Sequence, residues 1–180
     1  MDFANSADWT AEEAAVEDQD VLLEPDSLER WGERLGVAGR RGGPEELELA
    51  RDLRGFLHAI FSALARGDEP DESALARLRS DYAQAVDAGS VGRREDGAFG
   101  LQWPQDETRR VRFAVAADAV ALLADPARLA RVRRCPGRDC GWLFLDTSER
   151  RRWCSMTTCG SREQMRRMYA RKCAAESVSP

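Results

Sequence analysis

Two pairs of cysteines are the residues best suited to chemistry in this chain of 180 residues. Cys135 and Cys140 form the first pair, Cys154 and Cys159 the second, and four residues separate the members of each pair. Four thiolates close a tetrahedral structural zinc site and leave no open coordination position. Proline and glycine beside the first pair favour a tight turn that points both sulfurs at one ion. The spacing therefore predicts one structural Zn²⁺ ion.

Other uses of these thiols stay open at the level of sequence. Reduced cysteines also pack as small apolar side chains, and four sulfurs can hold iron as well as zinc. A redox dithiol is disfavoured because neither pair has Cys-x-x-Cys spacing. Cys173, the fifth cysteine, is expected to be unliganded because it lies well beyond the second pair. Zinc is the commoner occupant of such structural sites, and it is the metal that we predict.

The elements around the cysteines must hold them in place. Residues 141–146 have the composition of a strand, and residues 150–153 are expected to return as the second strand of a hairpin. Ser161 and Gln164 have the spacing of a capping box, which predicts a helix over 161–173. A knuckle, a hairpin and a ligand-bearing helix start form a treble-clef-like order. Zinc would replace the core that so small a module cannot build.

The cysteine region is strongly basic, although the whole chain has a net charge of −5. Residues 128–173 hold 13 basic and 4 acidic residues, a net charge of +9, which leaves −14 for the rest. An acidic body with one basic end is typical of a polyanion-binding protein, and arginine pairs bidentately with phosphate and guanine. We therefore predict that duplex DNA binds the cations around the second cysteine pair: Arg150, Arg151, Arg152, Arg162, Arg166, Arg167, Arg171 and Lys172.

Two alternatives compete for the same side chains. The cations would instead neutralise the zinc thiolates and dock on the acidic remainder of the chain, or on an acidic partner protein if the finger is a protein–protein adaptor. Trp142 and Trp153 would stack on RNA bases if they are exposed, and would form the core of the hairpin if they are buried. The exposure of these tryptophans therefore separates two of the hypotheses.

Residues 1–127 have the patterns of a mainly helical domain with a small β element, so the whole chain is expected to be α+β. Thr10 and Glu13 have capping-box spacing and predict an early helix start. Residues 98–103 alternate as a short strand. We place the zinc finger at 128–173 and a disordered tail at 174–180. Four further helices are predicted, at 25–36, 44–66, 71–88 and 111–123.

Little in the sequence favours an enzyme. There is no P-loop, Rossmann glycine pattern or nucleophile elbow. His58 is the only histidine, and we expect it on the exposed side of its helix. The absence of an apolar membrane span and of a secretory signal indicates a cytoplasmic protein without membrane contact. A small-molecule effector of the N-terminal domain is a hypothesis from the architecture alone. A deep pocket lined by polar groups beside Phe3, Trp9 and Trp103 would support it, and a solid core would exclude it. The sequence sets no oligomeric state.

Three motifs resemble the CGNR zinc finger: Trp142-x-Phe144-x-Asp146, the run from Arg151 to Met156, and Cys159-Gly160-Ser161-Arg162. The leading Met-Asp-Phe-Ala-Asn-Ser is similar to the start of the ABATE domain, which precedes that finger. The resemblance implies a bacterial stress-linked transcription regulator and places the four zinc ligands on the cysteines named above. Ser161 stands where the family has asparagine. Serine keeps the chemistry of a helix cap, but it would weaken an amide contact to a base.

Overall fold

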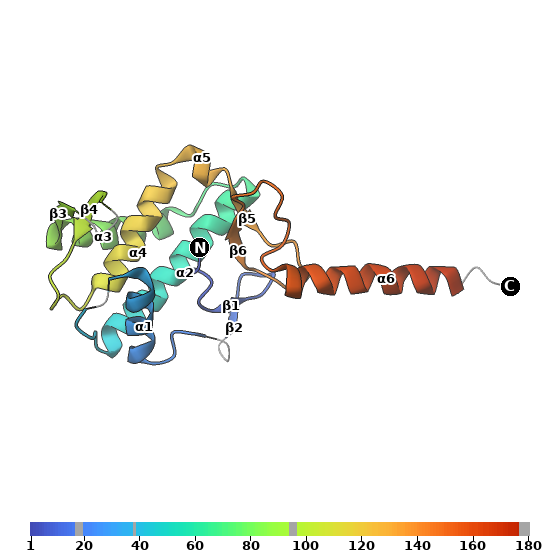
Figure 1. Ribbon diagram of the computed structural model, residues 1–180, viewed down its shortest axis with the longest axis horizontal. Helices are drawn as coiled ribbons and strands as arrows, with labels where there is room; N and C mark the ends of the chain where they lie inside the picture. Colours follow the sequence, from blue (N-terminus) through green and yellow to red (C-terminus); the bar gives the residue numbers. More distant parts are fainter. Residues whose placement is uncertain (17–19, 38, 94–96, 177–180) are drawn as a thin grey trace.

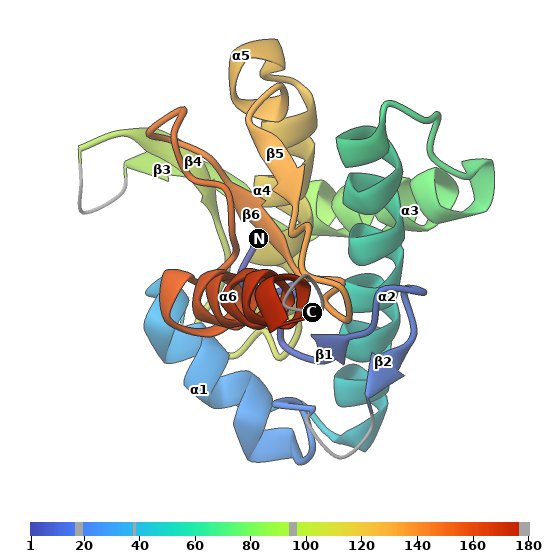
Figure 2. The ribbon, with the colours of Figure 1, turned by 90° about the vertical axis from the view of Figure 1, so that its right-hand side faces the viewer.

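The computed structural model describes residues 1–16, 20–37, 39–93 and 97–176. Helices form a rounded body, and one long C-terminal helix, α6, projects away from it (Figure 1). A view along that helix shows the body spread around its base (Figure 2). The chain is α+β, with a helical N-terminal region and a C-terminal four-cysteine module, as the sequence predicts.

Four helices build the body: α1 (Pro25–Leu35), α2 (Pro44–Arg66), α3 (Glu72–Ala88) and α4 (Arg110–Leu123). Their bounds agree closely with the predicted ones, because local signals set them. Prolines occupy the first turns of α1 and α2, and α2 ends at Gly67, whose φ of 83° is left-handed. These ends are encoded within a few residues of each helix.

Helix α2 lies at the centre of the hydrophobic core, with the other body helices around it. Leu53 and Ile60 of α2 are fully buried, and α3 packs against both α2 and α4. Val132 and Leu143 belong to the same core although they come from the cysteine region. The body and the first part of the zinc finger therefore share one core. Because β5 and β6 are anchored in this core, the first cysteine pair, which lies between them, is held in a fixed position.

In the part of the chain that the structure describes, three two-stranded antiparallel sheets complete the fold. The predicted strand at 98–103 is present as β4, and its partner, β3, was not predicted. The pairs are β1 (Asp8–Trp9) with β2 (Ala15–Val16), β3 (Ser90–Arg93) with β4 (Phe99–Gln102), and β5 (Val132–Arg134) with β6 (Leu143–Leu145).

The helix start predicted at Thr10 and Glu13 is wrong, because β1 and β2 occupy this segment. The backbone N–H of Thr10 donates to the carbonyl of Ala14, which closes a tight turn between the two strands. The carbonyl of Trp9 accepts a hydrogen bond from the N–H of Gly141, at 2.7 Å between N and O. An extended segment offers that carbonyl to a distant partner, and a helix would not. Tertiary contact overrides the local pattern here.

The hairpin of the finger also differs from the prediction. Strand β6 pairs with β5, before the first cysteine pair, and residues 150–153 form no strand. The first cysteine pair thus lies in the connection between the two paired strands. The backbone N–H of Arg151 donates to the carboxylate of Asp146 instead of joining a sheet. This bond turns the chain away from β6 and toward the second cysteine pair.

The C-terminal elements are the short helix α5 (Pro126–Leu129), a π-helical turn η2 (Met156–Gly160) and α6 (Ser161–Glu176). Helix α6 continues through 174–176, the first part of the segment expected to be a disordered tail, and 177–180 lie outside the described residues. No helix among the described residues has the length and apolar character needed to cross a membrane.

Candidate metal centre and finger surface

The four predicted zinc ligands meet at one point. Their Sγ atoms all lie within 4.8 Å of one another. The Sγ of Cys154 is 3.7 Å from that of Cys140 and 3.6 Å from that of Cys159. A tetrahedral ion with Zn–S bonds of about 2.3 Å sets its sulfurs roughly 3.8 Å apart, so the cluster fits zinc. Cys173 is exposed and does not belong to the cluster. The chain holds one structural zinc site.

The first pair lies in a knuckle between β5 and β6. The N–H of Cys135 donates to the carbonyl of Trp142 at 2.8 Å, which closes the knuckle at its base. The N–H of Cys140 donates to the carbonyl of Gly137 at 3.1 Å, which makes the turn. A Cβ at position 137 would lie 3.3 Å from the Sγ of Cys159, so glycine leaves room for the sulfurs. The glycine of this loop thus acts as the sequence predicts.

The second pair lies at the start of the C-terminal helix, but the predicted capping box is wrong. Ser155 caps the helical segment, since its hydroxyl accepts a hydrogen bond from the N–H of Thr158 at 3.3 Å. Cys159 is therefore already inside the first helical turn, which is π-helical. The hydroxyl of Ser161 instead donates to the carbonyl of Met156 at 3.1 Å. The capping residue, Ser155, thus lies six residues before the predicted one, Ser161. With this cap, both cysteines of the second pair can bind the ion from the start of the helix.

The four thiols influence one another strongly. Hydrogen bonds from Cys140 and Cys154 lower the pKa of Cys135, and the same contacts raise the pKa of Cys140 and of Cys154. One thiolate therefore forms easily, and each further thiolate is opposed by the negative charge already present. A bound dication removes that opposition and lets all four sulfurs coordinate as thiolates. The site needs a cation to be fully ionised.

Aromatic side chains cover the metal centre. Phe144 is buried with Cys135 and Cys159, and Trp142 and Trp153 pack against them half-buried. This favours the hairpin-core interpretation of both tryptophans over base stacking. The guanidinium of Arg151 lies 4.8 Å from the Phe144 ring centroid, and it donates to the carbonyls of Trp153 and Cys154. Arg151 therefore fastens the loop that carries the second cysteine pair.

Gly141 connects the knuckle to the N-terminal segment. Its N–H donates to Trp9, as described above, and its carbonyl accepts from Nε2 of His58 at 2.8 Å. A Cβ at this position would lie 2.2 Å from the carbonyl oxygen of Thr10. Only glycine allows this approach of two backbones. The side chain of Asn5 adds two bonds to Leu143, accepting from its N–H at 3.0 Å and donating to its carbonyl at 2.6 Å.

His58 is fully buried, so the expectation that it lies on an exposed face is wrong. Its ring stacks on Trp9, with centroids 3.8 Å apart and planes 10° from parallel. Burial lowers the pKa of His58 below its ordinary value of 6.5, and the bond to Gly141 only partly opposes this. His58 and Asn5 position the metal centre, although no sequence pattern predicts that role for either residue. No local pattern places Gly141 beside them.

The predicted DNA-contacting cations fall into two groups. Arg166 and Arg167 each pair with Glu163, both at 3.0 Å between nitrogen and oxygen, and Arg151 holds the carbonyls named above. Within the described part of the chain, the other five are exposed and make no ion pair or side-chain hydrogen bond: Arg150, Arg152, Arg162, Arg171 and Lys172. None of the eight pairs with a described carboxylate of residues 1–127.

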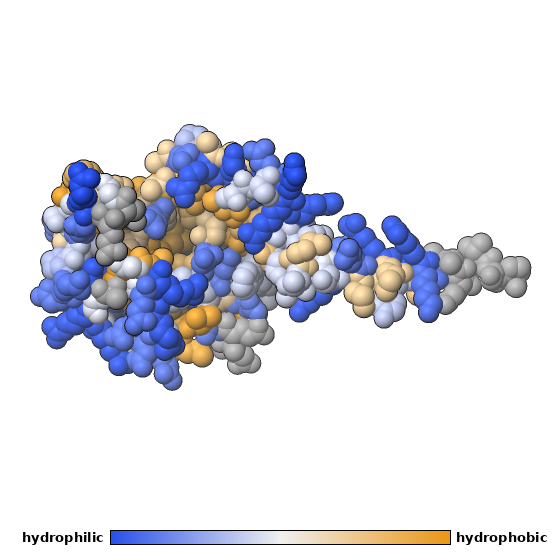
Figure 3. Space-filling model, viewed as in Figure 1, coloured by the Kyte–Doolittle hydropathy of each residue, from blue (hydrophilic) through white to orange (hydrophobic). Residues whose placement is uncertain are grey.

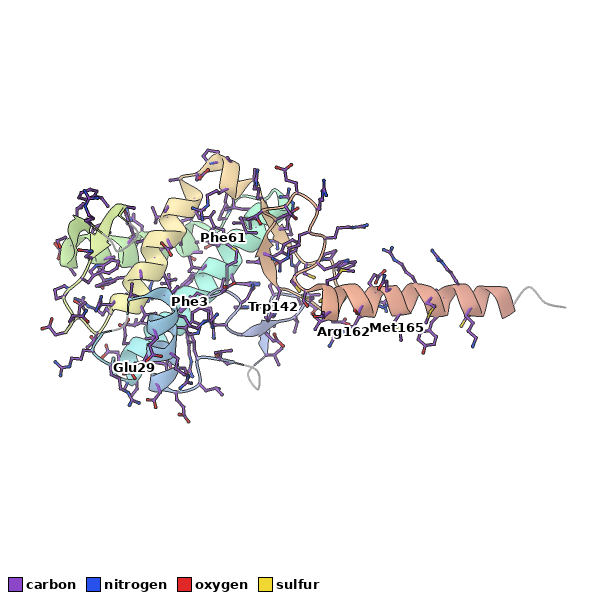
Figure 4. All side chains as sticks on the ribbon, viewed as in Figure 1. Phe3, Glu29, Phe61, Trp142, Arg162 and Met165 are labelled. Carbon is purple, nitrogen blue, oxygen red and sulfur yellow. The ribbon has the colours of Figure 1, made fainter. Side chains whose placement is uncertain are left out.

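Four of these cations line a cleft of about 650 Å³ beside the metal centre: Arg150, Arg151, Arg152 and Arg167. The cleft lies between the loop 148–156 and the first turns of α6, and its lining includes Arg150, Arg152 and Arg167. Arg162 and Met165 lie on the first turns of α6 (Figure 4). Figure 3 shows hydrophilic side chains along α6 and around its base, interrupted by a small apolar patch. The finger thus presents an open, positively charged surface.

Two family models match the chain. Residues 1–126 match ABATE, described as "Putative stress-induced transcription regulator", and residues 131–172 match the CGNR zinc finger. Neither is an enzyme family. Comparison with curated proteins gives no significant match.

Proposed function

Because the chain belongs to the ABATE family and carries a CGNR zinc finger, and so is a zinc-binding regulator, we propose that it acts by binding duplex DNA through that finger. It would act in the cytoplasm and without enzymatic chemistry of its own. The observation that carries the proposal is the set of five exposed cations without ion-pair partners in the described chain. An arginine whose charge is balanced internally has less to gain from a phosphate. These five have no such balance.

The direct contacts are assigned to the unpaired cations. Arg150 and Arg152 border the cleft, while Arg162 lies at the start of α6 and Arg171 and Lys172 near its end. A phosphate backbone that crosses the cleft would meet Arg150 and Arg152. Arg162 and Arg171 are nine residues apart and face opposite sides of α6, so they would contact different segments of the backbone. Arg166 and Arg167 share the single carboxylate of Glu163, so the three side chains together keep a positive charge. Arg151 is proposed to position the loop and not to touch DNA.

Salt-dependent binding to a random-sequence fluorescent duplex tests the proposal. Affinity should fall steeply between about 50 and 200 mM salt, because each phosphate contact releases condensed counterions. Arg162→Glu should weaken binding roughly tenfold and reduce the slope of log K against log salt by about one. The matched control is Arg79→Glu, an exposed arginine of α3 without a described ion pair, which should leave binding unchanged.

Zinc-loaded protein that binds no duplex even at low salt would overturn the proposal. Equal losses from Arg162→Glu and Arg79→Glu would overturn the assignment to the finger. If binding is found, selection from a random DNA library identifies the preferred sequence.

One observation favours the alternative of a protein–protein adaptor. Met165, Met168 and Tyr169 of α6 are 49%, 57% and 58% exposed, and their spacing places them on one helix face. Exposed neighbouring apolar side chains are typical of a protein-binding surface. An acidic partner with an apolar strip would match this face and its flanking arginines. Met165→Gln with Met168→Gln would then abolish the partner's binding, while duplex DNA binding persists.

A further inference from the structure

A second cavity, of about 530 Å³, lies between the body and the zinc finger. Residues of the leading segment, α1, α2 and α4 line one side, and β6 with residues Arg151 and Cys154 lines the other. Figure 3 shows a hollow with an apolar floor on this face of the body. Phe3 and Phe61 lie in the body, on the side of Trp142 that faces away from α6 (Figure 4). The cavity therefore joins the two parts of the molecule.

The location differs in part from the effector pocket that the sequence suggests. Phe3 does line the cavity, but Trp9 packs on His58, and Trp103 belongs to a separate cluster with Phe113. The expected pocket thus has one of its three aromatic residues. Trp9 and Trp103 pack against other residues and do not line this cavity.

The walls of the cavity are mainly apolar. Phe3, Trp31, Phe61, Leu122 and Phe144 are buried residues that contribute to its lining. Its volume falls within the range of about 300–1,000 Å³ that is usual for small-molecule sites. A ligand of this size would exclude water from the aromatic walls, which favours a hydrocarbon or aromatic body.

One buried hydrogen-bond donor and one exposed cation beside these walls have no partner in the described chain. Trp31 is only 5% exposed, and its indole N–H has no hydrogen-bond partner among the described residues. The guanidinium of Arg34 lies 4.3 Å from the centroid of the Trp31 ring and forms no ion pair in the described chain. Both residues line the cavity from adjacent turns of α1. A buried N–H without an acceptor is costly, and in native proteins it calls for an explanation.

The charged side chains that line the cavity carry a small net positive charge. Arg34, Arg128 and Arg151 line it together with Asp2 and Asp118. Arg151 already donates hydrogen bonds to backbone carbonyls. Arg34 forms no ion pair in the described chain and lies beside the indole ring of Trp31, so it is the cation best placed to bind a carboxylate there. A carboxylate would accept a hydrogen bond from the buried indole N–H of Trp31 and pair with the exposed guanidinium of Arg34.

We propose that this cavity binds a small apolar carboxylic acid, with its hydrocarbon or aromatic body against Phe3, Phe61 and Phe144 and its carboxylate on the Trp31 N–H and Arg34. Because β6 and Cys154 form part of the same lining, the ligand contacts the body and the finger together. The proposal gives the expected effector a site and a chemical class. It stands whether or not the finger binds DNA, since its test measures ligand binding alone.

Isothermal titration of the zinc-loaded full chain tests the proposal with octanoate and phenylacetate. Their neutral amides, octanamide and phenylacetamide, are the matched controls. At least one acid should bind about tenfold or more tightly than its amide, because only the acid offers a charge to Arg34. Arg34→Gln should remove this preference and leave the weak binding of the amide. Arg79→Gln, on α3 and away from the cavity, should change nothing.

A second measurement distinguishes this site from any other. The chain has five tryptophans, so its spectrum contains five indole N–H resonances. The acid, and not the amide, should shift one of them downfield, and that resonance should be missing in Trp31→Phe. The proposal is overturned if neither acid binds at millimolar concentration, if acid and amide bind equally, or if the Trp31 resonance does not move.

Discussion

The two halves of the zinc finger are anchored in opposite ways. The first half, β5, the knuckle and β6, is built into the body through Val132 and Leu143 in the common core. The second half, the loop after β6 with η2 and α6, carries the exposed cations and projects from the body (Figure 1). Each half supplies two of the four thiols. The metal therefore connects a fixed half to a free one.

This contrast shows what zinc does here beyond stabilising a small fold. A helix of this length is marginal in water when nothing packs along it. Arg151 and the zinc thiolates are the contacts that fix its start. Removing the metal should release the free half and leave the fixed half in place.

Cys154→Ser should lose most of the bound zinc, because apparent binding energies of four-thiolate sites, about 10–16 kcal/mol, depend on every ligand. Hydrogen exchange should then show fast exchange along α6, while α2 stays protected. Cys173→Ser should retain about one zinc per chain, since its thiol lies outside the cluster. If α2 loses its protection together with α6, the two halves do not behave separately.

Gly141→Ala should destabilise the fixed half by about 2–3 kcal/mol, because its Cβ would overlap the backbone of Thr10. Gly55→Ala is the matched control. A Cβ at position 55 meets nothing within 4 Å, so alanine should stabilise α2 by roughly 0.5–1 kcal/mol. Urea unfolding of both zinc-loaded variants measures the difference. Equal stabilities would mean that the knuckle is not held by this backbone contact.

The fixed half should also be weakened by mild acid through His58. Its pKa in the folded protein lies below the ordinary 6.5, so the unfolded chain binds the proton more readily. The stabilisation is therefore complete above about pH 6.5 and is lost as pH falls toward the folded pKa. His58→Gln should show a shallower loss of stability on acidification. Zinc content, followed in parallel, separates this effect from protonation of the thiolates, and parallel curves for both proteins would exclude His58.

Ser161→Asn, which restores the residue usual in the family, should have the smallest effect. The Ser161 side chain is exposed and bonds only to the carbonyl of Met156, so stability should change by less than about 0.5 kcal/mol. We also expect its effect on DNA affinity to be smaller than that of Arg162→Glu. A large gain in affinity would show instead that this position contacts bases.

The elements that were predictable carry their signals locally. Proline at the start of α2 and Gly67 at its end define that helix without reference to the rest of the chain. The metal centre was predictable for a different reason, since structural zinc takes four ligands, usually Cys or His, and four cysteines occur here in two spaced pairs. Neither inference required knowledge of distant contacts.

The errors arise where distant residues decide. Thr10 and Glu13 have the pattern of a helix start, but the knuckle, about 130 residues later, holds this segment extended. His58 has arginines nearby in sequence, yet it is buried under Trp9 and the Gly141 carbonyl. At the second cysteine pair, both Ser155 and Ser161 precede residues that could start the helix. Ser155 is the capping residue, because the helix must begin before Cys159 for both cysteines to reach the ion. These outcomes depend on three-dimensional contacts.

The pairing of Asn5 with Leu143 has a consequence for how the protein is made. The two residues are 138 positions apart, so the side chain of Asn5 cannot form these two bonds until Leu143 has been synthesised. Contacts of such sequence separation form late because closing the intervening loop costs entropy. These two bonds therefore form late in folding, whereas the contact of Phe3 with Trp31 of α1 spans few residues and can form early.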